Sequence, residues 1–284
     1  MNIGKAMNVR IPNRRNGTWQ TELTPSSSIL SPAAARAIPS KGLDTSSLAK
    51  NLLRYYETMS EALGPMNWWP AKTPFEVIVG AILTQSTSWG NVERAIENLR
   101  LARMLTLSAI LRVRTARLAA LVRPSGYFRQ KAKKLKVFAR FLQREYRGSL
   151  NFMFRTPTSE LREKLLSVHG IGPETADSIL LYAGNHSVFV VDAYTHRIFG
   201  RHGITAGKLD YETVRLLFES ALPRHPQLWN EFHALIVNTG KNWCRKSVPR
   251  CEECPLRSLL PPTSPLAQIL DMRQEINPLP GASA

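Results

Sequence analysis

The sequence has few acidic residues for its number of basic ones, and it has no long apolar run. Its 21 Asp and Glu stand against 38 Lys and Arg, which gives a formal net charge of +17 at pH 7. No apolar stretch approaches the roughly 20 residues that a helix needs to span a bilayer, so a membrane is the weaker explanation of this charge. An excess of positive charge favours a polyanion as the partner.

Cysteine is also scarce. Three cysteines occur in 284 residues, which is an odd number, and the N-terminus shows no apolar core of a secretory signal. We therefore expect a reducing compartment, the cytoplasm close to the nucleoid, and no disulfide framework.

Strand-like alternation is rare, whereas long stretches have the periodicity of amphipathic helices. An all-α fold is therefore expected, with one strand-like exception at 187–191, SVFVV. Residues 1–45 and 261–284 are rich in Pro, Ser and other small residues, so we expect a disordered basic extension and a flexible tail. The extension resembles a transit peptide in composition, and a DNA-searching arm or a misassigned start codon fits as well.

Positive charge is concentrated in residues 112–147, where twelve Lys and Arg stand against Glu145 alone. Solvated helical faces usually mix both signs, so we interpret this segment as a nucleic-acid contact. Phe138 and Phe141 lie between these bases, and we expect them in the core. An RNA-binding or nucleoid-packing protein is the remaining alternative on charge alone.

A Gly-x-Gly turn separates two helical patterns near residue 170. Gly170 and Gly172 permit backbone angles that a Cβ would penalise, and Pro173 suits the first turn of a helix. The N–H groups at such a helix start bind phosphate. An ordinary glycine-containing turn is the alternative. The single carboxylate that follows in an apolar setting, Asp192, suggests chemistry beside a DNA contact.

Residues 75–83 are apolar on most faces of a helix and are expected at the centre of the core. A polar segment follows, from which Gln85 can project outward. Trp68 and Trp69 precede the helix. Two adjacent tryptophans cannot easily share one burial direction, so at least one is expected to line a surface or pocket; capping the core is the alternative.

The chain resembles the helix-hairpin-helix DNA glycosylases of the endonuclease III superfamily, in particular the 3-methyladenine DNA glycosylase branch. The resemblance covers roughly residues 50–260 and rests on five motifs in order: WWP, PFEVIVGAILTQST, SGYFRQKAKKL, VHGIGPETA and VFVVDAYTHRIFGRHG. It implies two helical lobes with double-stranded DNA bound between them, and we expect a monomer. The implied parts are a six-helix barrel at 74–185 with its hairpin at 161–183, and a second lobe from 46–73 and 186–260 with a cysteine loop at 244–254.

The resemblance also implies site residues. Asp192 would be the catalytic carboxylate, stabilising an oxocarbenium-like sugar and orienting or deprotonating water. It would equally be the N-cap of the helix after it, and both roles can hold at once. Gly170, Gly172 and Thr175 would hold a phosphate beside the lesion. Gln85 would fill the gap left by the flipped base.

Two positions depart from the patterns of relatives. Bifunctional members place a lysine where this chain has Glu174, and a carboxylate cannot form a Schiff base, which indicates a monofunctional enzyme.

Adenine-mismatch members carry an acid where this chain has Ala81, so a neutral purine would be hard to expel. A cationic base such as 3-methyladenine leaves without protonation, and Trp68 or Trp69 would recognise it by cation–π stacking. An abasic-site lyase and a noncatalytic DNA-binding relative are the alternatives. The earlier Lys164 does not match the lysine position and is expected to be a solvated helix residue.

Cys244, Cys251 and Cys254 match the start of the superfamily's four-cysteine iron–sulfur signature. The fourth position is Leu260, and the chain has no other cysteine. A 4Fe–4S cluster normally takes four thiolates. Three alternatives therefore stay open: a labile fourth site, a nearby side chain as substitute, or loss of the metal. Zinc would also need a fourth ligand. Three bases of this loop are expected to contact phosphates in any case: Arg245, Lys246 and Arg250.

Overall fold

The computed structural model describes residues 46–205, 207, 209–264 and 266–267 in full, and residues 11–12, 19–20 and 45 by their backbone. The expected disordered extension over 1–45 lies almost wholly outside the described residues, and the expected flexible tail over 261–284 lies outside them beyond residue 267. Within the described part, none of the helices combines the length and apolarity needed to cross a bilayer.

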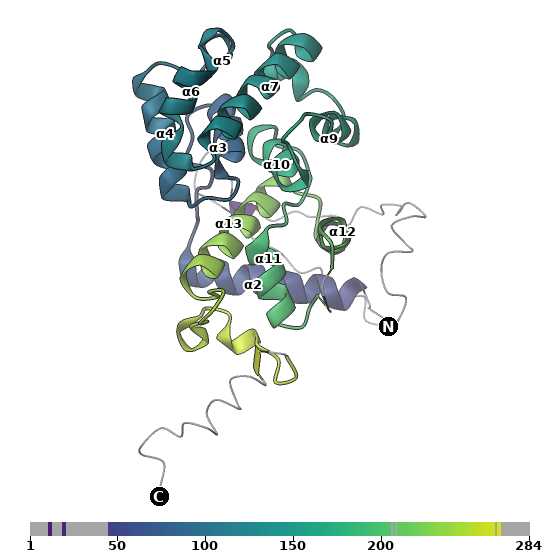
Figure 1. Cartoon of the computed structure of the whole chain (residues 1–284). Helices are drawn as coiled ribbons and strands as arrows, with labels where there is room; N and C mark the ends of the chain where they lie inside the picture. Colours follow the sequence, from purple (N-terminus) through teal and green to yellow (C-terminus); the bar gives the residue numbers. More distant parts are fainter. Residues whose placement is uncertain are drawn as a thin grey trace, which may run out of the picture. The chain divides into compact units, whose positions relative to one another are not determined.

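The described residues form helices joined by short loops (Figure 1), as the all-α prediction requires. Two short strands, β1 and β2, pair antiparallel. The elements in order are β1 (Ile11–Pro12), β2 (Trp19–Gln20), α2 (Thr45–Leu63), α3 (Pro74–Thr84), α4 (Trp89–Leu101), α5 (Leu107–Arg112), α6 (Thr115–Leu121), η1 (Arg123–Ser125), α7 (Phe128–Tyr146), α8 (Leu150–Met153), α9 (Thr158–Leu166), α10 (Pro173–Ser178), the π-helical turn η2 (Ile179–Ala183), α11 (Ala193–Arg201), α12 (Tyr211–Ala221), α13 (Pro226–Asn242), η3 (Cys251–Glu253) and η4 (Arg257–Leu259).

The chain divides into two compact units. One contains residues 1–66 and 191–284, and the other contains residues 67–190. The lobe boundaries expected from the resemblance, at 73/74 and 185/186, stay predictions.

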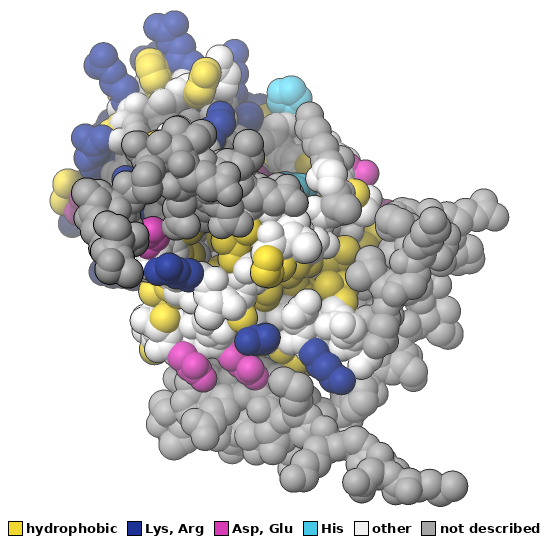
Figure 2. Space-filling view, turned by 90° about the horizontal axis from the view of Figure 1, so that it is seen from below, with side chains coloured by type: hydrophobic (Ala, Val, Ile, Leu, Met, Phe, Trp, Pro, Cys, Tyr) yellow, Lys and Arg dark blue, Asp and Glu magenta, His cyan; other side chains and the backbone are white. Residues whose placement is uncertain are grey.

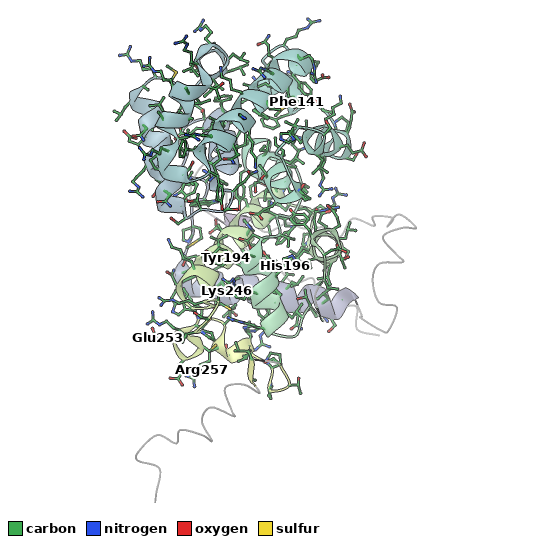
Figure 3. All side chains as sticks on the ribbon, viewed as in Figure 1. Phe141, Tyr194, His196, Lys246, Glu253 and Arg257 are labelled. Atoms are coloured by element: carbon green, nitrogen blue, oxygen red, sulfur yellow. The ribbon has the colours of Figure 1, made fainter. Side chains whose placement is uncertain are left out.

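In the unit of residues 67–190, α3 begins with a cap and a proline. The Thr73 hydroxyl accepts a hydrogen bond from the Glu76 N–H at 3.2 Å, and Pro74 is the first helical residue. Every residue from 75 to 83 is buried, so the predicted central helix is confirmed. On α7, Phe138 and Phe141 are buried as expected, and Figure 3 labels Phe141.

In the unit of residues 1–66 and 191–284, α2, α11, α12 and α13 enclose an aromatic core. Phe199, Phe218 and Phe232 are fully buried and pack with centroid distances of 4.9 to 6.3 Å. Edge and tilted arrangements of this kind stabilise helix packing beyond the area they bury.

The strand predicted at 187–191 is wrong. Among the described residues, no strand pairs with this segment, and it runs as irregular backbone into α11. Val188, Phe189, Val190 and Val191 are each at most 1 % exposed. A short apolar run satisfies burial equally well as a strand or as a buried connection, so its composition could not distinguish them.

Candidate active site and DNA-binding hairpin

Asp192 caps the N-terminus of α11. Its Oδ1 accepts hydrogen bonds from the backbone N–H groups of Tyr194 (2.9 Å) and Thr195 (2.8 Å) and from the Thr195 hydroxyl (3.0 Å). The Asp192 N–H donates in return to Thr195 Oγ1 at 3.3 Å, which completes a capping box. Oδ1 therefore holds the helix, and the capping bonds leave Oδ2 for another role.

Asp192 Oδ2 lies 3.6 Å from Nε2 of His233 on α13. This distance exceeds that of a hydrogen bond, so the contact is electrostatic. Burial alone would raise the pKa of Asp192, but His233 and the hydrogen bonds from Thr195 outweigh it, so the pKa lies below its ordinary value. The side chain is 11 % exposed and stays charged at neutral pH. Sequence reasoning missed His233, because it lies on a distant helix and no local pattern marks it.

The hairpin runs from α9 through a turn to α10, which begins at Pro173 as predicted. Gly170 has a φ of +90°, and a Cβ there would lie 2.6 Å from Cγ of Lys134. Gly172 is different, since its φ is −94° and an added Cβ would meet nothing within 4 Å. The backbone therefore requires glycine at Gly170, and the expectation that Gly172 is needed for the turn is corrected.

Gln85 follows α3 and bonds to the hairpin. Its Nε2 donates to the Gly170 carbonyl (3.0 Å) and to Thr175 Oγ1 (2.9 Å), and its Oε1 accepts a hydrogen bond from Lys134 Nζ. The side chain thus braces α3, α7 and the hairpin, whereas the sequence suggested that it projects outward. Lys134 was missed as a hairpin residue, because in the sequence it is one of many bases.

A buried ion pair joins α9 to α10. Arg162 Nε and Nη2 donate to the two carboxylate oxygens of Asp177 at 2.7 and 3.0 Å. The Asp177 side chain is fully buried and that of Arg162 is 15 % exposed. Two parallel hydrogen bonds fix both distance and angle, so this pair sets how the two hairpin helices cross.

The structure shows whether the side chains at the positions that depart from relatives' patterns are exposed or buried. Glu174 is exposed in the first turn of α10, and Ala81 is buried within α3. Lys164 lies on the surface of α9, where its Nζ is 2.8 Å from Glu160. Its interpretation as a solvated helix lysine is therefore confirmed.

Four aromatic side chains form a cluster in the unit of residues 67–190. Trp69 lies 5.2 Å, between ring centroids, from each of Trp68, Trp89 and Tyr182. Trp68 and Trp89 are 4.7 Å apart. Trp69 rests on the backbone of α3, where a Cβ at Gly80 would lie 3.0 Å from its ring. Trp89 and Tyr182 were not predicted, because each is distant in sequence from the WWP motif.

Trp69 has a buried polar atom without a partner. Within the described part of the chain, its Nε1 meets no hydrogen-bond acceptor. Buried donors in proteins are normally paired, and an exception indicates a functional or ligand-binding role.

Comparison with known proteins identifies the family of this chain. Residues 79–224 match the family described as HhH-GPD superfamily base excision DNA repair protein. The protein named "Putative DNA repair glycosylase MJ1434" of Methanocaldococcus jannaschii is 46 % identical over 208 residues, which cover 72 % of this chain and 94 % of that protein. The chain belongs to the HhH-GPD superfamily. This membership confirms the predicted DNA N-glycosylase class and supports DNA as the polyanion.

Solved structures agree with the HhH-GPD fold. The Helicobacter pylori 3-methyladenine DNA glycosylase MagIII, bound to 1,N6-ethenoadenine, is 31 % identical with a TM-score of 0.59, covering 70 % of this chain and 98 % of that one. An endonuclease III–DNA complex has a TM-score of 0.66 at 20 % identity, covering 79 % of this chain and 98 % of that one, and shows the likeness of fold.

Most of the basic segment 112–147 of this HhH-GPD protein faces solvent. Nine of its twelve bases are exposed, and Figure 2 shows Lys and Arg side chains gathered toward one side of the visible face. Lys131 and Lys136 are buried instead. Lys131 Nζ donates to the carbonyls of Leu83 (2.8 Å) and Ser125 (2.5 Å), and burial lowers its pKa to about 8. These two bases stabilise the fold, so not every base of the segment is available to a polyanion.

Two arginines of α11 hold the loop after α13. Arg197 Nε donates to the Cys244 carbonyl at 2.6 Å. Arg201 donates to the carbonyls of Arg245 (2.7 Å) and Lys246 (2.8 Å). The side chains of Arg245 and Lys246 are exposed, and Figure 3 labels Lys246 on this loop. Their phosphate contacts stay a prediction.

The three cysteines of this loop are free thiols. Cys244, Cys251 and Cys254 line one cavity. Within the described residues, no group of three or more His, Cys, Asp or Glu is arranged to hold a single metal ion.

Gly240 of α13 lets α11 approach closely, because a Cβ there would lie 2.3 Å from Cδ1 of Tyr194. We expect Gly240→Ala to displace the first turn of α11, lower the free energy of unfolding by about 1 to 3 kcal/mol and slow base release, since Asp192 caps that turn. Chemical denaturation and a base-release assay measure the two effects. Gly90→Ala, whose Cβ meets nothing within 4 Å, is the control. Equal losses in both variants would contradict the prediction.

Proposed function

We propose that this protein is a monofunctional DNA glycosylase that hydrolyses the N-glycosidic bond of alkylated, cationic purines in double-stranded DNA. The observation that carries the proposal is Asp192, a carboxylate held by α11 and kept charged by His233 although its side chain is 11 % exposed. A fixed negative charge in a water-poor site stabilises positive charge that develops in a transition state.

The reaction needs little from the protein beyond this charge and a water molecule. When the bond between C1′ and the base breaks, its electron pair goes to the base and neutralises the cationic ring. The sugar becomes oxocarbenium-like, and Asp192 Oδ2 stabilises it. Water then adds to C1′, and its proton passes to solvent by way of the carboxylate. His233 acts as a positioning residue, because it contacts Asp192 and not the reacting atoms.

Two features support a cationic leaving group: Ala81, and the aromatic cluster of Trp68, Trp69, Trp89 and Tyr182. Buried Ala81 offers no proton to a neutral purine at the position where adenine-mismatch relatives have an acid. A cationic ring is attracted to aromatic faces by about 0.5 to 2 kcal/mol. These features support recognition of an alkylated purine.

The hairpin supplies the grip on the DNA backbone. The first turn of α10 has backbone N–H groups of the kind that bind phosphate. Thr175 Oγ1 accepts a hydrogen bond from Gln85, so its own proton is available for a phosphate oxygen. Contacts of this kind hold DNA without reading its sequence. Arg245 and Lys246 would add salt-sensitive contacts from the exposed loop.

Glu174 supports a reaction without a lyase step. A lyase needs an amine that attacks C1′, and an exposed carboxylate stands at the lysine position of bifunctional relatives. Lys164 on the preceding helix is engaged with Glu160. We therefore propose that the product is an intact strand with an abasic site.

The test uses duplex DNA treated with a methylating agent. We expect the full-length protein to release methylated purines, to leave strands intact until alkali is added, and to form no covalent adduct on borohydride reduction. An adduct would show a lyase and overturn the monofunctional assignment. Tight DNA binding without base release would identify a noncatalytic relative. Equal binding of methylated and intact duplex, again without release, would favour a nucleoid-packing protein.

A further inference from the structure

One cavity in the unit of residues 1–66 and 191–284 collects soft metal ligands. It is lined by Cys244, Cys251, Cys254 and His202, and apolar side chains complete its wall. Cys244 follows α13, the other two cysteines lie at η3, and His202 follows α11. Four potential ligands from three separate parts of the chain therefore face one small space.

The donor set fits an iron–sulfur cluster better than a single ion. All three thiols line this one cavity. Yet within the described part of the chain no His, Cys, Asp or Glu trio is placed to hold one ion. Thiolates are the usual ligands of iron–sulfur clusters, and histidine replaces cysteine in some of them.

Arg201 contacts one of the three sulfurs. Its Nη1 lies 3.3 Å from Cys244 Sγ and donates a hydrogen bond to it. Hydrogen bonds to the ligating sulfurs are among the protein features that tune an iron–sulfur cluster. The same guanidinium holds the loop carbonyls of Arg245 and Lys246, so the loop conformation and the sulfur are fixed together.

The hydrogen bonds of Tyr55 set the tautomer of His202. The Tyr55 hydroxyl donates its proton to the Leu259 carbonyl at 3.0 Å. It also lies 2.9 Å from His202 Nδ1, and with the hydroxyl proton on Leu259 this contact takes Nδ1 as the donor. Nε2 then carries the lone pair. Metal-bound histidines commonly donate their other ring N–H in this way.

His202 also lies beside the place of the missing cysteine. The four-cysteine signature would end at Leu260, immediately after η4. Tyr55 connects His202 to Leu259, the residue before that position. The imidazole is therefore linked through Tyr55 to the residue that precedes the position of the missing cysteine.

We propose that His202 Nε2 is the fourth ligand of a 4Fe–4S cluster held by Cys244, Cys251 and Cys254. Binding releases the protons of the three thiols, and His202 binds in its neutral form. The bound cluster would supply a rigid link between α11, α13 and the loop, with the capacity to exchange one electron. This proposal does not depend on base excision, because it concerns residues that the hydrolytic step does not use.

The test is anaerobic reconstitution of the full chain, labelled with 15N-histidine, using ferrous iron and sulfide. We expect about four irons per chain and an absorbance band near roughly 400 nm. Pulsed electron paramagnetic resonance of the cluster should show a strongly coupled 15N nucleus. No bound iron and sulfide, or a zinc ion in their place, would overturn the proposal.

Variants separate ligation from packing. His202→Asn keeps a donor for Tyr55 but has no Nε2, so we expect the nitrogen coupling to vanish and iron content to fall. His202→Cys restores a fourth thiolate and should keep the cluster without nitrogen coupling, which decides the matter should the asparagine variant not fold. His196→Ala, on the same helix, should retain both signals. Nitrogen coupling that persists in His202→Asn would exclude His202 as the ligand.

Discussion

Replacing Asp192 with asparagine is expected to slow base release from methylated duplex DNA by at least about 10³-fold, because the transition-state charge loses its fixed counter-charge. Asparagine is itself a good N-cap. It can accept the hydrogen bonds that Oδ1 now accepts from Tyr194 and Thr195. Stability and DNA binding should therefore change little. Single-turnover release, binding and thermal unfolding measure the three quantities.

Asp210→Asn is the matched control, because Asp210 caps α12 in the same way, with its Oδ1 2.8 Å from the Thr213 N–H. It should release bases at the wild-type rate. The dependence of the release rate on pH, on the acidic side, gives a further check on Asp192. Since its pKa lies below the ordinary value, the carboxylate stays ionised, and the rate should hold until the pH falls below the range in which aspartate ordinarily titrates. Wild-type release by Asp192→Asn would remove the basis of the proposed mechanism.

Breaking the buried ion pair of the hairpin should have the largest effect on stability. Asp177→Ala leaves the mostly buried Arg162 without its counter-charge, so we expect the free energy of unfolding to fall by about 3 to 5 kcal/mol. DNA binding should weaken as well, because the pair sets the crossing of α9 and α10. Denaturant titration and binding to an undamaged duplex measure these losses.

Two further variants test whether burial causes this effect. Glu160→Ala removes an exposed partner of Lys164 on the same helix and should leave stability nearly unchanged. The double variant Arg162→Met with Asp177→Leu replaces both charges by apolar side chains, and it should recover much of the stability lost in Asp177→Ala. A double variant as unstable as Asp177→Ala would refute burial of an unpaired charge as the cause.

Local sequence patterns were enough to predict several features of this HhH-GPD protein. The Gly-x-Gly turn with Pro173, the cap at Asp192 and the apolar helix at 75–83 all depend on residues within a few positions of one another. Helix hydrogen bonds and caps join residues three or four apart, so such features are readable without knowledge of the fold. The motif order likewise identified the family that the comparisons confirm.

Tertiary packing decided the rest. The contact of His233 with Asp192, the bond from Lys134 to Gln85 and the cavity that joins His202 to the cysteine loop each connect distant helices. The same packing buried Lys131 and turned the strand-like run at 187–191 into a covered connection. Whether a base, a histidine or an apolar run meets solvent or a partner depends on which helices cover it. Sequence alone therefore determined the family, the hairpin and the helix cap that holds Asp192, and the fold determined which side chains surround them.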